Sequence, residues 1–173
     1  LEKFADLIGH IFTADAVRIL LARNGRFEEY TLNRNGDPLV FARDDALPLV
    51  LDDVGHPVAA EFLARLRPTP RLQQAARDMA EHRVALASGI YSKGRMEGIL
   101  LLGRRIPGRI YGLPDQQSIQ LLCNQLYVAI ENARLYTALQ DNMIYNEILL
   151  DNLTAGVVAS DDQANVTLLN REA

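Results

Sequence analysis

Side chains that commonly perform chemistry are few in this chain of 173 residues, and their spacing favours neither catalysis nor metal binding. Cys123 is the only cysteine in the sequence, so the chain can form no internal disulfide and no zinc cage of several thiolates. The three histidines, His10, His56 and His82, include no pair four residues apart, the spacing that places two metal ligands on one helix face. Paired aspartates are typical of solvated turns. We therefore expect no catalytic residue and no metal site.

Positive charge is concentrated in the middle of the sequence. Residues 65–109 carry 10 basic and 3 acidic side chains, whereas residues 1–64 carry 6 and 11, and residues 110–173 carry 2 and 8. Two interpretations stay open: the basic segment binds an anionic ligand, or its arginines are solvated side chains on loops. The net charge of −4 argues against nucleic acid as a partner.

The composition is that of a folded, water-soluble protein, with 49% apolar and 23% charged residues. No apolar run reaches the roughly 18 residues that a membrane span needs, and no basic and apolar leader opens the chain. We expect a cytoplasmic chain that makes no direct membrane contact, with membrane anchoring of a longer protein left open.

The elements that must position any site begin with an amphipathic helix over residues 1–12, whose apolar residues recur every three or four positions. Residues 16–22 (AVRILLA) then predict a strand. Asn24-Gly25 is a strong hairpin signal, so residues 27–32 are expected to return beside the first strand.

The next segment, residues 44–82, predicts short helices and loops that cross one face of the sheet, with helical spacing over 44–54 and 59–66 and one or two further helical turns over 73–81. Residues 84–91 (VALASGIY) and 96–104 (MEGILLLGR) predict a second hairpin. The continuous apolar run within its second strand is typical of a central strand that is covered on both faces.

A long helix opens at Pro114 and Asp115, because proline suits a first turn and an acidic residue suits the positive end of the helix dipole. It could extend over about 35 residues, roughly 50 Å, which is longer than a domain core uses. Its apolar residues follow a coiled-coil spacing, which predicts pairing with a second copy. Residues 156–160 and 165–170 then predict a small hairpin, and we expect a natural chain to continue beyond it because two strands alone are marginal in water.

Several of these segments resemble a GAF domain. Residues 97–103 (EGILLLG), Tyr111, Asp115 and residues 129–136 (AIENARLY) are similar to the closing strand, the loop and the final helix of that family. Residues 49–62 also resemble the family's segment between its second and third strands.

The resemblance divides the chain into three parts. Residues 1–140 are similar to a GAF sensory domain, and residues 141–150 to a linker helix that continues its last helix. Residues 151–173 resemble the opening of a truncated PAS domain, whose first hairpin also ends in an asparagine.

The resemblance implies an α+β sandwich with a central antiparallel sheet of five or six strands, helices on both faces and a long C-terminal helix. It also implies a non-catalytic sensory and dimerisation input module of a bacterial signalling protein, with a sensor histidine kinase as the leading case. Such a module relays a change in its pocket or dimer state through a coiled-coil helix to a downstream output domain. The alternative is a GAF domain dedicated to one small anionic ligand, such as a nucleotide, in a transcription activator or a diguanylate cyclase.

Family members that carry cofactors have residues that this sequence lacks. Reduction of methionine sulfoxide needs a second, resolving thiol, and covalent bilin attachment needs a thiol in the pocket, whereas Cys123 lies in the long helix. His56 or His82 could serve as an axial haem ligand, but single histidines are more often surface or capping residues. The cyclic-nucleotide pattern of phosphodiesterase GAF domains is absent. We therefore expect no cofactor, neither haem nor bilin.

Two sets of site residues follow. In this family the crossing segment roofs a cavity over the sheet, although its apolar side chains could equally fill the core. The ligand-pocket candidates are Leu49, Val50, Val58, Phe62, Leu66, Arg83, Val84, Leu86, Arg95 and Leu100. The homodimer would use the N-terminal and long helices. The alternative is that the apolar residues in the first part of the long helix do no more than cover the sheet of their own chain. The dimer-interface candidates are Phe4, Ile8, Ile119, Leu122, Leu126, Ala129, Ala133 and Tyr136.

Overall fold

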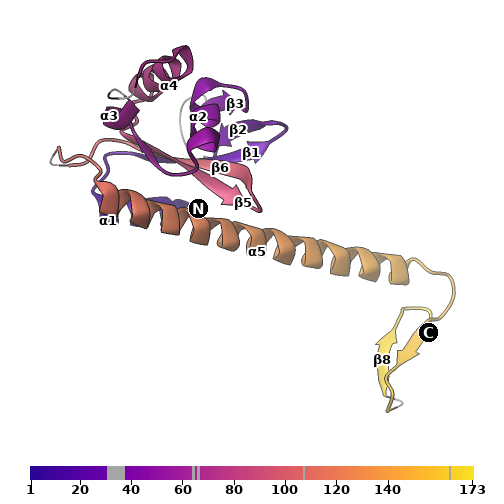
Figure 1. Ribbon diagram of the computed structural model, residues 1–173. Coiled ribbons are helices and arrows are strands. Elements are labelled where there is room, and N and C mark those ends of the chain that lie inside the picture. The colour runs from indigo at the N-terminus through magenta and orange to yellow at the C-terminus, as the bar shows by residue number, and fades with distance from the viewer. Residues whose placement is uncertain (31–37, 64, 66, 107, 164) are drawn as a thin grey trace. The chain divides into compact units, whose positions relative to one another are not determined.

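A six-stranded antiparallel sheet forms the centre of the first of two units in the computed structural model (Figure 1). The structure describes residues 1–30, 38–63, 65, 67–106, 108–163 and 165–173. The units are Leu1–Val128 and Ala129–Ala173. The strand order is β3-β2-β1-β6-β5-β4, so the predicted fold class is confirmed. The strands are β1 (Val17–Arg23), β2 (Arg26–Glu29), β3 (Val40–Ala42), β4 (Val58–Ala59), β5 (Leu86–Ser92) and β6 (Arg95–Leu102).

Two tight turns connect the four inner strands of the sheet in pairs. Asn24 and Gly25, with φ of 46° and 80°, join β1 to β2, and Lys93 and Gly94, with φ of 45° and 78°, join β5 to β6. Positive φ at both central residues matches the right-handed twist of the flanking strands. Both predicted hairpins are confirmed, while residues 31–32 of the first lie outside the described residues.

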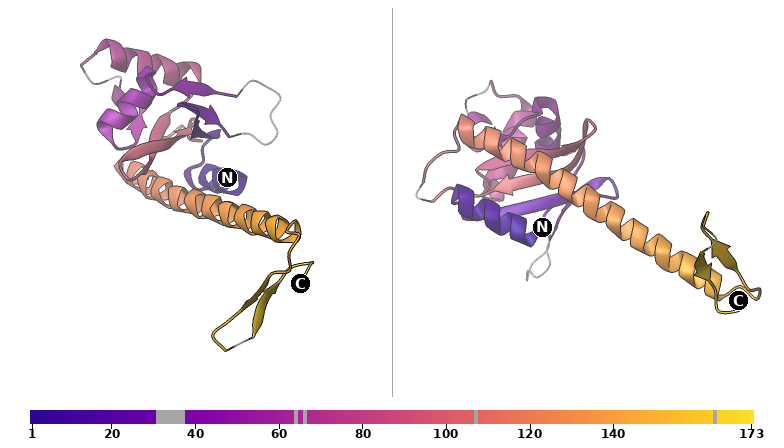
Figure 2. Two further views of the ribbon diagram at one scale, coloured as in Figure 1. Left: turned by 90° about the vertical axis from the view of Figure 1, so that its right-hand side faces the viewer. Right: turned by 90° about the horizontal axis from the view of Figure 1, so that it is seen from below.

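Helices cover the two faces of this sheet unequally (Figures 1 and 2). One face carries α2 (Ala46–Val54), α3 (Ala60–Leu63) and α4 (Pro70–Glu81), as expected for the crossing segment. The other carries α1 (Glu2–Phe12) and the first turns of α5 (Leu113–Asp151). Side chains alternate along each strand, so neighbours such as Ile99 and Leu100 are both buried but on opposite faces.

The crossing segment differs from its prediction in detail. The helix expected over 59–66 is a two-residue strand, β4, followed by the single turn of α3. The helix expected over 73–81 begins earlier, at Pro70. Thr69 caps it, since its hydroxyl oxygen accepts a hydrogen bond of 3.3 Å from the Leu72 amide, and proline at the first position needs no such partner.

The long helix α5 has 39 residues, and a carboxylate in its first turn caps its start. The Asp115 carboxylate accepts a 3.0 Å hydrogen bond from the Gly112 amide, three residues back, and thereby satisfies a donor that the helix leaves free. Ile119, Cys123 and Leu126 are its buried residues in the first unit. No helix in the described part of the chain is long and apolar enough to span a membrane.

The second unit contains the rest of α5 and a hairpin of β7 (Val158–Ser160) and β8 (Val166–Leu169). Asn170 is its buried polar residue. The Asn170 amide group donates to the carbonyls of Leu150 (3.0 Å) and Ala155 (2.9 Å), and its oxygen accepts from the Val157 amide at 2.7 Å. One side chain, just after β8, thus joins the end of α5 to the residues that lead into β7.

Candidate functional site

The apolar residues predicted to line one ligand cavity are divided between the core and separate hollows. Val50, Val58 and Val84 are buried in one cluster with residues of the sheet and of α4. These three side chains therefore fill the core and do not roof a ligand cavity over the sheet. Phe62 is exposed on α3, and Leu66 lies outside the described residues.

Leu86 and Leu100 were expected beneath the crossing segment, and this part of the prediction is wrong. Leu100 pairs across the sheet with Ser88, whose hydroxyl contacts the Cys123 thiol at 3.5 Å on the α5 side. Leu86 lies two residues before Ser88 on the same strand and therefore shares that face. An unbroken apolar run such as 99–102 does not reveal which residues face which layer.

The remaining candidates lie in different hollows. Leu49 and Arg95 line a hollow of about 230 Å³ with Arg43, whose guanidinium lies 4.9 Å from the centre of the Phe27 ring. Arg95 is also paired with Glu97 at 3.5 Å. Val50, already placed in the core cluster, also borders a groove of about 510 Å³ between α2 and α4.

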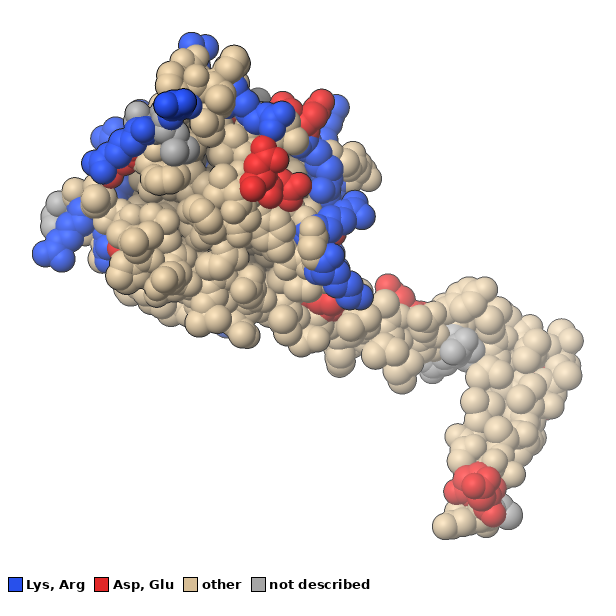
Figure 3. Space-filling view, viewed as in Figure 1, with Lys and Arg blue, Asp and Glu red and all other residues tan. Residues whose placement is uncertain are grey.

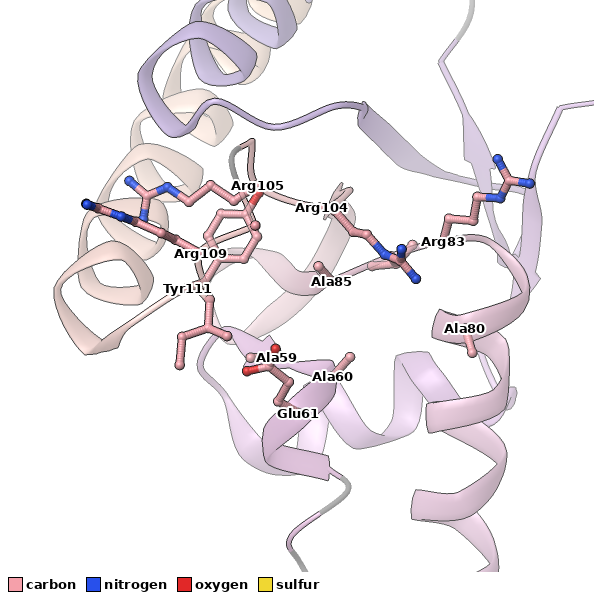
Figure 4. A pocket seen from close by; sticks show the side chains of 13 residues that line it. Ala59, Ala60, Glu61, Ala80, Arg83, Ala85, Arg104, Arg105, Arg109 and Tyr111 are labelled. Atoms are coloured by element: carbon pink, nitrogen blue, oxygen red, sulfur yellow. The ribbon is translucent and has the colours of Figure 1, made fainter.

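A strongly charged hollow with a volume of about 330 Å³ is lined by another candidate, Arg83, and by the edge of Val84 (Figure 4). It lies where α4 ends, where β4 meets α3, and where the chain leaves β6 toward α5. We call it the arginine pocket. It is lined by Ala59, Ala60, Glu61, Ala80, Arg83, Val84, Ala85, Arg104, Arg105, Gly108, Arg109, Ile110 and Tyr111.

The arginines surround a floor of small residues. In Figure 4, Arg105 and Arg109 extend toward the same side, past Tyr111, whereas Arg104 and Arg83 lie across the hollow and Arg83 extends outward from its rim. Arg83, Arg104 and Arg109 are exposed, and none of the three forms an ion pair within the described part of the chain. Basic side chains gather over the first unit on the face seen in Figure 3.

Arg105 connects this pocket to the start of α5. It donates a 2.8 Å hydrogen bond to Asp115, the same carboxylate that accepts from the Gly112 amide. Its guanidinium also lies 5.9 Å from the centre of the Tyr111 ring. Tyr111 donates to the Gly103 carbonyl at 2.9 Å, and burial raises the pKa of its phenol to about 12. The loop is therefore fixed to both β6 and α5.

Sequence reasoning identified Arg83 but missed Arg104, Arg105 and Arg109. The excess of arginine between residues 65 and 109 was the available signal. What it did not reveal is that the chain brings the ends of α4 and β6 to one side of the sheet.

The Cys123 thiol is buried, and the three imidazoles lie in different surroundings. Burial raises the pKa of Cys123 to about 11, so the thiol is protonated at neutral pH and is a poor nucleophile. His82 ends α4 and packs edge-on against Phe41, with ring centres 5.7 Å apart. His56 contacts the neighbouring Pro57 carbonyl at 3.0 Å, and His10 is exposed in the last turn of α1.

The dimer candidates fall into two groups. Ile8, Ile119 and Leu126 are buried within their own unit, so they are not available to a partner and this part of the predicted interface is corrected. Phe4 and Leu122 are half-buried. Ala129, Ala133 and Tyr136 are exposed on α5.

Another row of exposed apolar residues runs along α5. Leu121, Val128 and Leu135 follow one another at seven-residue intervals, with exposed fractions of 61%, 50% and 56%. Two residues turn a helix by about 200°, so Leu121 lies nearly opposite the sheet-facing Ile119. We call Leu121, Val128 and Leu135, with exposed Leu139 one turn on, the outer row of α5.

Comparison with known proteins identifies the fold. No family model and no curated protein matches the sequence. Among solved structures, residues 122–287 of a methyl-accepting chemotaxis protein align with 78% of this chain and 88% of that chain, at 18% identity and a TM-score of 0.61. The GAF domain of a two-component sensor histidine kinase from Bacillus halodurans aligns with 79% of this chain and 97% of that domain's chain, at 19% identity and a TM-score of 0.52.

A far-red cyanobacteriochrome photoreceptor also aligns, over 75% of this chain and 83% of that chain, at 14% identity and a TM-score of 0.53. At these identities the likeness concerns the fold. The sheet and long helix of this chain have the architecture of GAF domains from signalling proteins.

Proposed function

We propose that this chain is a non-catalytic sensory and dimerisation module of a cytoplasmic signalling protein, such as a sensor histidine kinase, in which α5 relays the state of the sheet domain to an output domain. The observation that carries the proposal is that the two ends of α5 differ in burial. Its first turns bury Ile119, Cys123 and Leu126, whereas the helix continues to Asp151 with exposed apolar residues. The GAF-type fold, found in sensor kinases and a chemotaxis protein, supports the same function.

A second copy of the chain is the partner that suits the outer row. Seven-residue spacing lets two parallel helices meet along one seam, because each apolar side chain then faces its counterpart. The row of Leu121, Val128 and Leu135 continues at the same interval with Asn142 and Leu149, all exposed. An asparagine at one core position of a coiled coil fixes the register of the two helices and favours a dimer.

The second unit supports the relay. Asn170, just after β8, binds the last turn of α5 and the residues that lead into β7, so a rotation of the helix end would move the hairpin with it. In this proposal the hairpin is the beginning of a PAS-like domain, and the module needs neither a cofactor nor nucleic acid.

Sedimentation equilibrium of the 173-residue chain tests the dimer. We expect a mass of twice 19.3 kDa at a protein concentration of about 100 μM, at which a dimer with a micromolar dissociation constant is populated. A mass of 19.3 kDa throughout the concentration range would contradict the proposed function.

A further inference from the structure

We propose that the arginine pocket binds the phosphate group of a small organic anion, and that binding draws Arg105 away from Asp115 at the start of α5. The binding half of this inference stands on the pocket itself. Its consequence for signalling rests on the proposed relay through α5.

The charge in the pocket sets the ligand class. Arg83, Arg104 and Arg109 have no anionic partner in the described part of the chain, and Glu61 is the acidic residue among those that line the pocket. Arg105 is neutralised by Asp115. The pocket therefore carries two positive charges in excess, which a phosphate monoester with about −1.5 to −2 charges at neutral pH would balance. Guanidinium groups also match phosphate oxygens in pairs.

The walls indicate that the ligand has an organic part. A volume of about 330 Å³ is within the range of small-molecule sites, about 300–1,000 Å³. Alanines 59, 60, 80 and 85 leave the floor open, and Ile110 and Tyr111 offer apolar surface on the loop side. Arg83, Arg104 and Arg109 are exposed, and in this proposal rotation about their side-chain bonds lets a bound phosphate draw the guanidinium groups toward the floor.

The link to α5 follows from shared contacts. Asp115 Oδ2 accepts hydrogen bonds from both Arg105 and the Gly112 amide, so the ion pair and the helix cap use the same oxygen. When a phosphate binds Arg105, Asp115 Oδ2 keeps only its hydrogen bond from the Gly112 amide. The ligand and Asp115 thus compete for one guanidinium.

This competition predicts opposite effects from two kinds of variant, both measured by isothermal titration calorimetry at low ionic strength with phenyl phosphate as the probe. The double variant Arg104→Gln/Arg109→Gln should bind about 100-fold more weakly, at about tenfold or 1.4 kcal/mol for each guanidinium. Asp115→Asn frees Arg105 but keeps an oxygen for the cap, so it should bind about two- to fivefold more tightly.

Matched controls separate the site from net charge. Arg23→Gln/Arg77→Gln removes two exposed arginines that do not line the pocket, and Asp44→Asn removes an exposed carboxylate elsewhere. Both should bind phenyl phosphate as the parent chain does. Circular dichroism of every variant checks the fold.

Two further probes define the ligand. Inorganic phosphate alone should bind more weakly than phenyl phosphate, and benzyl alcohol should not bind. Equal affinity for the two phosphates would assign the site to free phosphate and overturn the organic-ligand part of the inference.

Equal losses in the pocket double variant and its arginine control would overturn the site itself. A dimer that binds no phosphate would refute only this inference, whereas a monomer that binds phosphate through these arginines would refute only the proposed relay.

Discussion

Leu135→Arg is expected to dissociate the dimer. In the proposed parallel pair, residue 135 of each helix faces its counterpart in the seam, so the variant places two like charges opposite each other in an apolar contact. Burying like charges in an apolar contact is costly, and we expect the dissociation constant to rise at least about 100-fold, or about 2.7 kcal/mol. In the free chain Leu135 is 56% exposed, so the substitution removes no contact of the folded core. Sedimentation at several concentrations measures the change.

Ala133→Arg is the matched control, because it introduces the same charge into the same helix about 200° around its axis. Ala133 is exposed, and it belongs to the row that the sequence predicted as the seam. An outer-row dimer tolerates this variant with little change. Dissociation by Ala133→Arg together with tolerance of Leu135→Arg would place the seam on the row containing Ala129 and Tyr136.

Ile119→Ala is expected to destabilise the sheet domain by about 2–5 kcal/mol, the usual cost of removing a large aliphatic side chain from a core. Ile119 is fully buried on α5 against the sheet, where it lies four residues before Cys123. The loss of packing should lower the urea concentration at the unfolding midpoint with little change in the slope of the transition.

Leu121→Ala provides the comparison, two residues further along the helix. Leu121 is 61% exposed, so its truncation should change the free energy of unfolding of the monomer by no more than about 0.5 kcal/mol. It should weaken dimerisation instead. Similar unfolding midpoints for Ile119→Ala and the parent chain would show that the first turns of α5 do not hold the sheet.

Local signals predicted much of the fold. Asn24-Gly25 and Lys93-Gly94 adopt the positive φ values that two-residue hairpins need, and both hairpins form as expected. The start of α5 was also foreseen, because Pro114 and Asp115 suit the first turn of a helix. These features depend on residues close together in the chain.

Other features depend on contacts that no short segment contains. The short strands β3 and β4 carry too few residues to show a period, and each exists through pairing with a neighbouring strand. Leu86 and Leu100 could not be assigned to a face, since both faces of their strands are buried.

The same ambiguity affected α5 and the arginine pocket. A heptad row drawn from the sequence combined Ile119 and Leu126, which belong to the sheet domain, with Ala133, which is exposed. The three-dimensional burial of the helix separates these roles. Arg104, Arg105 and Arg109 lie on a loop whose position is set by Tyr111 and Asp115 rather than by any repeating pattern.

Disulfide cross-linking at residue 135 tests the central claim, a parallel dimer through the outer row of α5, most directly. The measurement uses Leu135→Cys in a Cys123→Ala background, with Ala133→Cys as the comparison, because a disulfide forms only when the two Cα atoms come within about 7 Å. After mild oxidation, the account predicts that the Leu135→Cys chain runs at twice its mass on a non-reducing gel and that the Ala133→Cys chain, which is not cross-linked, runs at the mass of one chain. Cross-linking of Ala133→Cys but not of Leu135→Cys, or of neither, would contradict it.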